Sequence, residues 1–303
     1  MKVVFLGTSG SIPTPRRGSP AVAVAREREL LLFDCGEGTQ QKMFAAHLGF
    51  GRPTKVFISH LHGDHILGLP GIIQTMSLLG REQPLQIYGP RGLCQFLAFF
   101  SALFGGPNFS LEVEEIEETG EVCTGRGYTV SAVPADHGTE GWSYALIEEP
   151  RPGKFHQEKA LELGVPKGPL WKQLQQGKAV ALPNNRIVRS EEVADPPRPG
   201  RRIVYSGDTR PNYALVELAK GADLLIHEST FGDELAEKAA LDGHSTPSQA
   251  AEVARRAGVR ELILTHISPR YVDSSVLLEQ AGLIFERTRV AEDLMEVEVP
   301  LRA

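Results

Sequence analysis

The chain has few cysteines and no long apolar run. Its 303 residues include Cys35, Cys94 and Cys123, and no two are spaced as Cys-x-x-Cys. This indicates neither a disulfide framework nor a zinc site built from thiolates, so metal chemistry here should use nitrogen and oxygen ligands. No apolar stretch reaches the roughly 18 residues that a membrane span needs. Because Met1-Lys2 leads directly into an expected strand and not into a secretory signal, we expect a cytosolic protein without a membrane partner.

A strong charge of one sign is also missing, since 32 basic and 38 acidic residues give a net charge of −6. No internal repeat is visible. The length fits one large domain with an insertion, or two domains. Hydrophobic segments alternate between strand and helix periodicity, which predicts an α/β protein. Expected strands include 2–6, 21–25, 30–33 and 85–88, and expected helices include 92–104 and 276–285.

The run at 59–65, SHLHGDH, directly follows an expected buried strand at 55–58. Two of its histidines alternate around Leu61 and can point the same way, whereas an Asp-His pair lies beyond the flexible Gly63. Imidazole is a common metal ligand, and one ion cannot easily use four neighbouring residues. We therefore expect two adjacent ions about 3.5–4 Å apart, each taking two residues of this run. The residues concerned are His60, His62, Asp64 and His65.

Later expected strands also end at residues that can bind metals. The strand at 128–133 ends near His137, the strand at 202–205 runs into Asp208, and the strand at 261–265 stops at His266. Taken singly, each residue is more often a turn residue or a helix cap. Together with the 59–65 run they form a more specific pattern, and they are candidates for the remaining ligands.

Further motifs surround these candidates. They are FLGTSG at 5–10, LFDCGEGTQ at 32–40, SGDTR at 206–210, HESTF at 227–231, GHST at 243–246 and LTHIS at 264–268. With the 59–65 run, they make the chain resemble the metallo-β-lactamase superfamily of hydrolases. Within it the chain resembles the ribonuclease Z family, endonucleases that remove the 3′ trailer of precursor tRNA. The GHST segment and an insertion described below narrow the resemblance to that family.

The resemblance implies a four-layer α/β/β/α sandwich, with two sheets face to face, helices outside and metals at one edge of the sheets. It also implies two zinc ions per subunit, although manganese and iron share these ligand types. A metal-bound hydroxide would attack phosphorus and leave a 3′-hydroxyl, and Asp64 would orient that water or take its proton. The implied ligands are His60, His62 and His137 for one ion, Asp64, His65 and His266 for the other, and Asp208 as a bridge.

The departing oxygen needs a proton, and the resemblance makes His244 the candidate acid, with Glu228 holding and charging it. A local alternative is that 246–249 forms a capping box for a helix at 248–257, and for Ser245 and Thr246 we favour this capping role. His227 is as well explained by a structural hydrogen bond as by a role behind the site.

Two residues of the LFDCGEGTQ motif are expected to act on structure. Asp34 should support the metal loop without binding metal. Thr39 should cap a helix over 40–48.

The segment at about 149–200 differs from the rest and is expected to be an inserted arm. Between Arg151 and Lys178 it carries six basic and two acidic residues, a net charge of +4, which leaves −10 for the remainder. A basic arm on an acidic body fits local gripping of RNA phosphates, by shape more than by base sequence. A flexible basic loop is the alternative. The resemblance implies a tRNA-binding arm with a Gly-Pro motif, and the candidate residues are Lys154, Lys167, Gly168, Pro169 and Lys172.

The stretch at 13–20 departs from a family loop of the Pro-x-Lys-x-Arg-Asn type that handles the 3′ CCA end. Its basic charge is kept in Arg16 and Arg17, which are candidates for binding phosphates near the site, and a solvated turn is an equal alternative. The expected partner is precursor tRNA, not DNA, and the family implies a homodimer. Rival functions are hydrolysis of small esters or phosphodiesters by the same fold, and noncatalytic RNA binding.

Overall fold

The apolar and alternating segments of the chain form two seven-stranded sheets, described in a computed structural model that covers residues 1–302. Both sheets belong to a first unit, made of residues 1–147 and 202–300. A second unit comprises residues 148–201 and 301–302. No helix within residues 1–302 combines the length and apolar character needed to cross a membrane.

The first sheet has the strand order β16-β1-β2-β3-β4-β5-β6. Strands β16, β1, β2 and β3 pair antiparallel, and β3 to β6 pair parallel. The parallel part therefore needs crossover connections, and helices supply them. The strands are β1 (Lys2–Gly7), β2 (Ala21–Arg26), β3 (Glu29–Phe33), β4 (Thr54–Phe57), β5 (Leu85–Gly89), β6 (Leu111–Glu115) and β16 (Glu296–Glu298).

The second sheet has the order β15-β14-β13-β12-β9-β8-β7. Its strands β12 to β15 pair parallel, while β12 pairs antiparallel with β9. The strands are β7 (Gly120–Gly125), β8 (Tyr128–Pro134), β9 (Trp142–Glu148), β12 (Arg202–Tyr205), β13 (Leu224–Glu228), β14 (Leu262–Thr265) and β15 (Thr288–Val290).

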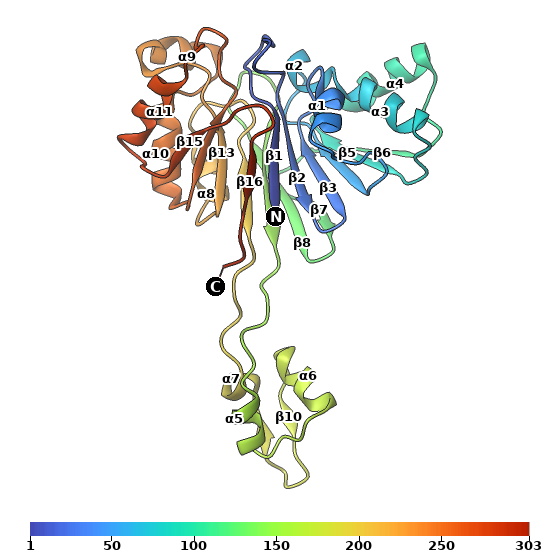
Figure 1. Ribbon diagram of the computed structural model, residues 1–303, viewed down its shortest axis with the longest axis vertical. Coiled ribbons are helices and arrows are strands. Elements are labelled where there is room, and N and C mark those ends of the chain that lie inside the picture. The colour runs from blue at the N-terminus through green and yellow to red at the C-terminus, as the bar shows by residue number, and fades with distance from the viewer. Residues whose placement is uncertain (303) are drawn as a thin grey trace. The chain divides into compact units, whose positions relative to one another are not determined.

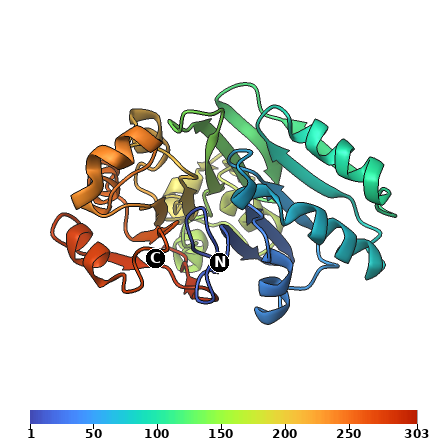
Figure 2. The same ribbon diagram turned by 90° about the horizontal axis from the view of Figure 1, so that it is seen from above.

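Helices cover the outer faces of both sheets (Figures 1 and 2). On the first sheet these include α1 (Thr39–Ala45), α3 (Leu69–Leu78) and α4 (Leu93–Phe104). On the second they include α8 (Tyr213–Leu218), α10 (Pro247–Ala257) and α11 (Ser275–Gly282). The first unit also contains α2 (Gly63–Ile66), η1 (Asp233–Leu235) and α9 (Ala236–Asp242).

Strand alternation explains why the sheets pack in this way. In β1, Val3 and Phe5 enter the core between the two sheets, whereas Val4 and Leu6 enter the core under the helices of the first sheet. Three apolar layers result, one between the sheets and one under each helical layer. The predicted four-layer α/β/β/α sandwich is thereby confirmed.

Element boundaries differ from the predictions at a few places. The helix expected at 40–48 begins at Thr39, and Gly38 precedes it in the left-handed region with φ of 81°. The prediction that Thr39 caps this helix is wrong, because its Oγ1 donates to the Gly36 carbonyl at 2.6 Å. Strand β13 contains the first two residues of the HESTF motif, His227 and Glu228.

The second unit has a small apolar core of its own. Around this core lie α5 (Gln157–Glu162), α6 (Pro169–Gln175), α7 (Ser190–Val193) and the hairpin of β10 (Val180–Ala181) with β11 (Ile187–Val188). The indole Nε1 of Trp171 donates to the Val165 carbonyl at 3.1 Å, and the ring contacts Phe155. Buried Leu174 and Val188 complete a core that a flexible loop would lack. The short hairpin was not expected from the sequence.

Candidate metal centre

Histidines and aspartates gather where strands of both sheets end. His60 follows β4 of the first sheet and forms an isolated bridge with Gly141, which precedes β9 of the second. His137, Asp208 and His266 follow β8, β12 and β14. Chain segments far apart in sequence therefore deliver their side chains to one edge of the sandwich.

The first candidate group consists of His60, His62 and His137. The Nε2 atom of His60 lies 2.9 Å from Nδ1 of His62, and that Nδ1 lies 3.2 Å from Nε2 of His137. His60 and His137 are buried, whereas His62 is exposed. Three imidazole nitrogens thus converge on one point, with one side open to solvent.

The second candidate group consists of Asp64, His65 and His266. The Nε2 atoms of the two histidines lie 3.3 Å apart, and Oδ2 of Asp64 lies 3.5 Å from each of them. The same Oδ2 accepts a hydrogen bond from the Ser11 backbone N–H at 2.9 Å. Asp64 is therefore fixed by the 11–19 loop as well as by its own helix, α2.

Asp208 lies between the two groups. Its Oδ2 is 3.3 Å from Nε2 of His65 and 3.2 Å from Nε2 of His266. The Nε2 atoms of His60 and His137 each lie 3.8 Å from it. Burial alone would raise the pKa of Asp208, but the neighbouring histidines, first His266, hold it well below its usual range. An ionised carboxylate in this position can be shared by two ions.

The outward-facing nitrogens of four of these histidines all have hydrogen-bond partners. The Nδ1 atoms of His60, His65, His137 and His266 contact Ser59 Oγ at 3.0 Å, Asp34 Oδ2 at 2.7 Å, Gly243 O at 2.7 Å and Thr230 Oγ1 at 2.8 Å. Such partners fix the tautomer and leave Nε2 free to bind a metal. Inward-facing imidazoles and carboxylates are a donor set that suits zinc, manganese or iron. The residues present therefore fit divalent metal ions.

Asp34 supports this centre through hydrogen bonds to residues that neighbour or belong to the candidate ligands. It has no exposed surface, and its carboxylate accepts hydrogen bonds from Ser59, His65 and Tyr205. Its backbone φ of 57° is unusual for a residue other than glycine, and His266 shares this conformation with φ of 56°. Such conformations persist only where surrounding contacts hold them.

The His244 and Glu228 side chains form a hydrogen-bonded pair beside the metal groups. His244 Nδ1 lies 2.9 Å from Glu228 Oε1 and 3.9 Å from Asp208 Oδ2. Burial lowers the pKa of His244, but the charge and hydrogen bond of Glu228 outweigh this and raise it to about 9. Glu228 is itself held by the N–H and Oγ1 of Thr230 and by the Thr209 N–H. Glu228 therefore favours the protonated form of His244.

The residues next to His244 and Glu228 in the sequence make hydrogen bonds that stabilise the local structure. Thr246 forms the predicted capping box of α10 with Gln249. Ser245 does not cap that helix, because its Oγ donates to the Thr209 carbonyl at 2.6 Å. His227 Nδ1 contacts the Glu228 carbonyl at 2.7 Å, and its Nε2 has no partner within residues 1–302.

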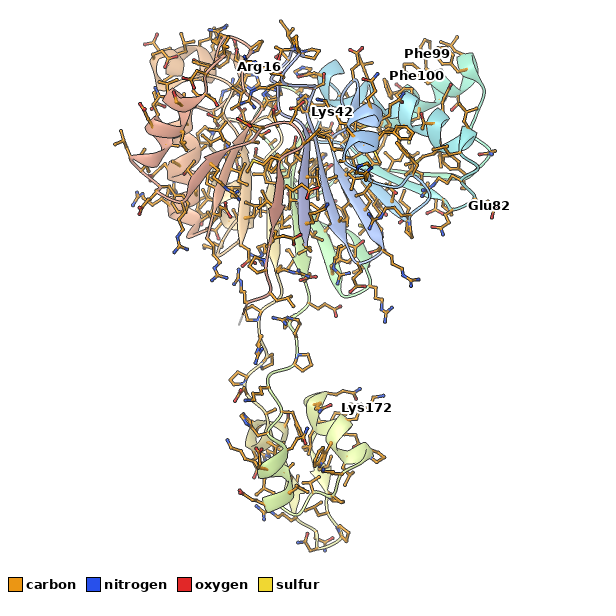
Figure 3. The ribbon with its side chains drawn as sticks, in the orientation of Figure 1. Arg16, Lys42, Glu82, Phe99, Phe100 and Lys172 are labelled. Atoms are coloured by element: carbon orange, nitrogen blue, oxygen red, sulfur yellow. The ribbon has the colours of Figure 1, made fainter. Side chains whose placement is uncertain are left out.

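The candidate RNA-binding residues lie in both units. In the second unit Lys154, Lys167 and Lys172 are exposed, and the Lys167 ammonium lies 5.9 Å from the centre of the Trp171 ring. Gly168, with φ of 147°, and Pro169 open α6. Figure 3 labels Lys172 on this helix.

Arg16 and Arg17 in the first unit have different environments. Arg16 is exposed (Figure 3). The Arg17 guanidinium is partly buried and donates to Thr8 Oγ1 at 2.8 Å and to the Ala291 carbonyl at 2.5 Å. Of this pair, Arg16 is therefore the better placed to meet a phosphate.

Several supporting groups were missed from the sequence. Tyr205, Thr230 and the Gly243 carbonyl orient other site residues, and the Ser11 N–H holds Asp64. Thr230 and Gly243 belong to the HESTF and GHST motifs, so these motifs could have indicated their roles in the site. The Ser11 and Tyr205 contacts join distant segments, so no local pattern pointed to them.

Comparison with known proteins finds relatives that are similar over almost the whole chain. Ribonuclease Z of Methanosarcina acetivorans is 52% identical over 304 residues, covering 100% of this chain and 99% of the relative. Ribonuclease Z of Haloferax volcanii is 48% identical and covers 99% and 95%. Two family models also match, "Anti-Pycsar protein Apyc1" at residues 1–150 and "Beta-lactamase superfamily domain" at residues 192–267.

Solved structures agree with this similarity. Human tRNase Z, short form, superposes with a TM-score of 0.74 at 31% identity, covering 99% of this chain and 100% of that one. The metallo-β-lactamase fold protein YhfI from Bacillus subtilis has a TM-score of 0.70 at 18% identity, covering 98% and 99%. The second likeness concerns the fold alone.

Proposed function

Because the chain belongs to the ribonuclease Z family, we propose that this protein is an endoribonuclease that removes the 3′ trailer of precursor tRNA and leaves a 3′-hydroxyl. One observation carries the proposal. Asp208 lies between two groups of candidate ligands, and the His244–Glu228 pair lies beside it. This arrangement offers metal sites for a phosphodiester and an acid for its leaving group.

The proposed ligands follow the two groups. His60, His62 and His137 would hold one ion, Asp64, His65 and His266 the other, and Asp208 both. Zinc is the proposed metal, with two ions per subunit. Bound at this site, the ions supply a water of lowered pKa and positive charge for the phosphoryl oxygens.

The side chains of the protein perform the proton transfers. Asp64, held by the Ser11 N–H, orients the attacking water and accepts its proton. As the bond between phosphorus and the 3′-oxygen breaks, protonated His244 gives its proton to that oxygen. Glu228 keeps His244 charged until then. The products are a tRNA with a 3′-hydroxyl and a trailer with a 5′-phosphate.

The second unit is the proposed binding site for the tRNA body. Residues 148–201 carry ten basic and seven acidic residues, a net charge of +3, in a chain whose net charge is −6. Exposed lysines such as Lys154, Lys167 and Lys172 can neutralise phosphates without reading bases. Binding by this unit should therefore depend on salt and on RNA shape. A precursor tRNA substrate fits action in the cytoplasm.

A homodimer is proposed, with the apolar surface of α3 and α4 as its interface. Leu78, Phe99, Leu103 and Phe104 are 60–88% exposed there, and Figure 3 shows Phe99 and Phe100 at this end of the first unit. Exposed apolar side chains in such a group mark an association surface. A Phe99→Glu/Leu103→Glu variant should sediment as a monomer, and a dimer of unchanged strength would exclude this surface.

Cleavage assays distinguish the proposed function from its rivals. The purified protein, loaded with zinc, is incubated with precursor tRNA and separately with bis(p-nitrophenyl) phosphate. Trailer removal that leaves a 3′-hydroxyl supports the proposal. Hydrolysis of the small diester alone would favour a different metallohydrolase, and RNA binding without cleavage would favour a noncatalytic role.

A further inference from the structure

One buried carboxylate contacts residues that lead to both candidate metal groups. The Oδ1 atom of Asp34 accepts from the Ser59 N–H at 2.6 Å. Its Oδ2 accepts from Ser59 Oγ at 2.8 Å, His65 Nδ1 at 2.7 Å and the Tyr205 hydroxyl at 2.7 Å. Asp34 is fully buried, so these four donors replace the water that an ionised carboxylate would otherwise need.

These hydrogen bonds determine where the protons of two ligand histidines lie. Because the Asp34 carboxylate accepts at Oδ2, a neutral His65 carries its proton on Nδ1 and keeps a lone pair on Nε2. The Ser59 hydroxyl gives its proton to Asp34 and therefore accepts from Nδ1 of His60, 3.0 Å away. His60 then also keeps a lone pair on Nε2. The two histidines belong to different candidate groups.

The fourth donor, Tyr205, comes from the other sheet. Asp34 follows β3 of the first sheet, whereas Tyr205 ends β12 of the second, three residues before Asp208. The Tyr205 hydroxyl therefore links β12, which leads to Asp208, to the Asp34 carboxylate. That carboxylate in turn orients His60 and His65. Tyr205 is 4% exposed, so this contact is shielded from solvent.

We propose that Tyr205 is a positioning residue for both metal ions. Its hydroxyl holds the Asp34 carboxylate in the orientation that presents Nε2 of His65 directly, and Nε2 of His60 through Ser59. This inference depends on the proposed metal ligands and not on the RNA substrate. Metal binding can therefore test it separately from cleavage.

The test compares Tyr205→Phe with Tyr144→Phe in the full chain. Tyr144 is buried as well, and its hydroxyl donates its hydrogen bond to the Ile58 carbonyl at 2.7 Å and not to Asp34. Both rings pack against Phe33, so the two variants lose similar hydroxyl groups from the same core. The melting temperature of each metal-free variant measures the common structural cost.

Zinc affinity is measured by competition with a chromophoric chelator, and the cobalt-substituted proteins are compared by absorption spectroscopy. Loss of a group that orients metal ligands typically weakens binding by about 10–100-fold, and we expect this for both ions in Tyr205→Phe. The cobalt spectrum should change with it. Tyr144→Phe should keep the wild-type affinities and spectrum. Equal affinities in the two variants, or weakening of one ion only in Tyr205→Phe, would overturn the proposal.

A Ser59→Ala variant tests the hydrogen-bond route from Asp34 through Ser59 to His60. It also provides a test if Tyr205→Phe does not fold. It removes the hydroxyl between Asp34 and His60 but leaves the His65 contact. The zinc ion proposed to bind His60 should bind more weakly, while the ion proposed to bind His65 keeps its affinity. Equal weakening of both ions, or no change, would exclude the route through Ser59.

Discussion

The two units of this protein place their charged side chains in opposite environments. In the first unit His60, His65, His137, Asp208 and His266 are all at most 6% exposed. In the second unit Lys154, Lys167 and Lys172 are exposed. Five of the seven proposed metal ligands are thus buried, whereas the proposed phosphate-binding lysines are open to solvent.

The hydrogen bonds explain this difference. Each buried histidine of the centre needs a partner for its second nitrogen, and side chains or carbonyls from distant segments supply one. The second unit needs only a core large enough to hold α5 to α7 and the hairpin, because its lysines act mainly through charge. Changes in the first unit should therefore affect chemistry, and changes in the second should affect RNA affinity.

An Asp64→Ala variant tests the chemical side of this comparison most strongly. Removing both the ligand and the proton acceptor should lower the turnover of precursor tRNA and of bis(p-nitrophenyl) phosphate alike, each by about 10³-fold. Steady-state kinetics with both substrates measure this. Normal cleavage by the variant would refute the proposed mechanism.

A His244→Ala variant should distinguish the two substrates. Loss of the acid should slow precursor tRNA cleavage by about 10²-fold, because the departing ribose oxygen needs a proton. Hydrolysis of bis(p-nitrophenyl) phosphate should change far less, since nitrophenolate departs without one. Equal losses for both substrates would contradict the assignment of His244 as the acid.

Excision of the second unit should impair binding of precursor tRNA and leave the chemical step intact. The backbones of Arg151 and Arg198 pair in both directions at 2.8 Å, so two glycines can replace residues 152–197 between them. The KM for precursor tRNA should rise by about 10²-fold with the loss of phosphate contacts, while small-diester hydrolysis stays unchanged. Parallel losses in both activities would show that this unit does more than bind RNA.

A Glu228→Gln variant tests the electrostatic coupling within the first unit. The pKa of His244, about 9, should fall towards or below the ordinary value of about 6.5 once the carboxylate is neutral. An acid must be protonated to act, so activity is lost as pH rises through its pKa. The alkaline limb of kcat against pH should therefore move to lower pH. An unmoved limb would show that another group controls it.

Single lysines of the second unit should have the smallest effect. A Lys172→Ala variant should weaken precursor tRNA binding a few-fold and reduce the slope of log Kd against log salt by about 1. Lys220→Ala is the matched control, because Lys220 is an exposed lysine of the first unit paired with Glu217. If the control weakens binding as much, overall charge and not a local surface governs affinity.

Most of the cluster of candidate metal ligands could be predicted, because these residues follow strands with clear hydrophobic periodicity. The 59–65 run and the residues after β8, β12 and β14 meet as expected of strand ends at one sheet edge. The capping box of α10 was predicted for a similar local reason, whereas the four-layer sandwich was implied by the family resemblance and its motifs. What could be predicted was therefore carried by motifs and strand periodicity.

The remaining features depend on tertiary contacts. Nothing near Ser11 in the sequence indicates that its N–H meets Asp64, 53 positions away, or that Tyr205 meets Asp34, 171 positions away. Thr39 looked like a cap, but Gly38 supplies a left-handed turn before it, and the threonine hydroxyl bonds to Gly36. The two-residue strands β10 and β11 are too short to show a period.

The second unit begins and ends at neighbouring points of one ladder. Glu148 and Arg201 are joined by a backbone hydrogen bond of 2.9 Å, next to the pairing of β9 with β12. The fold of the first unit therefore already closes this connection, whatever its length. Each doubling of a flexible connection costs only about 0.6 kcal/mol of closure entropy. A change in the length of this segment should therefore leave the register of β9 and β12 intact.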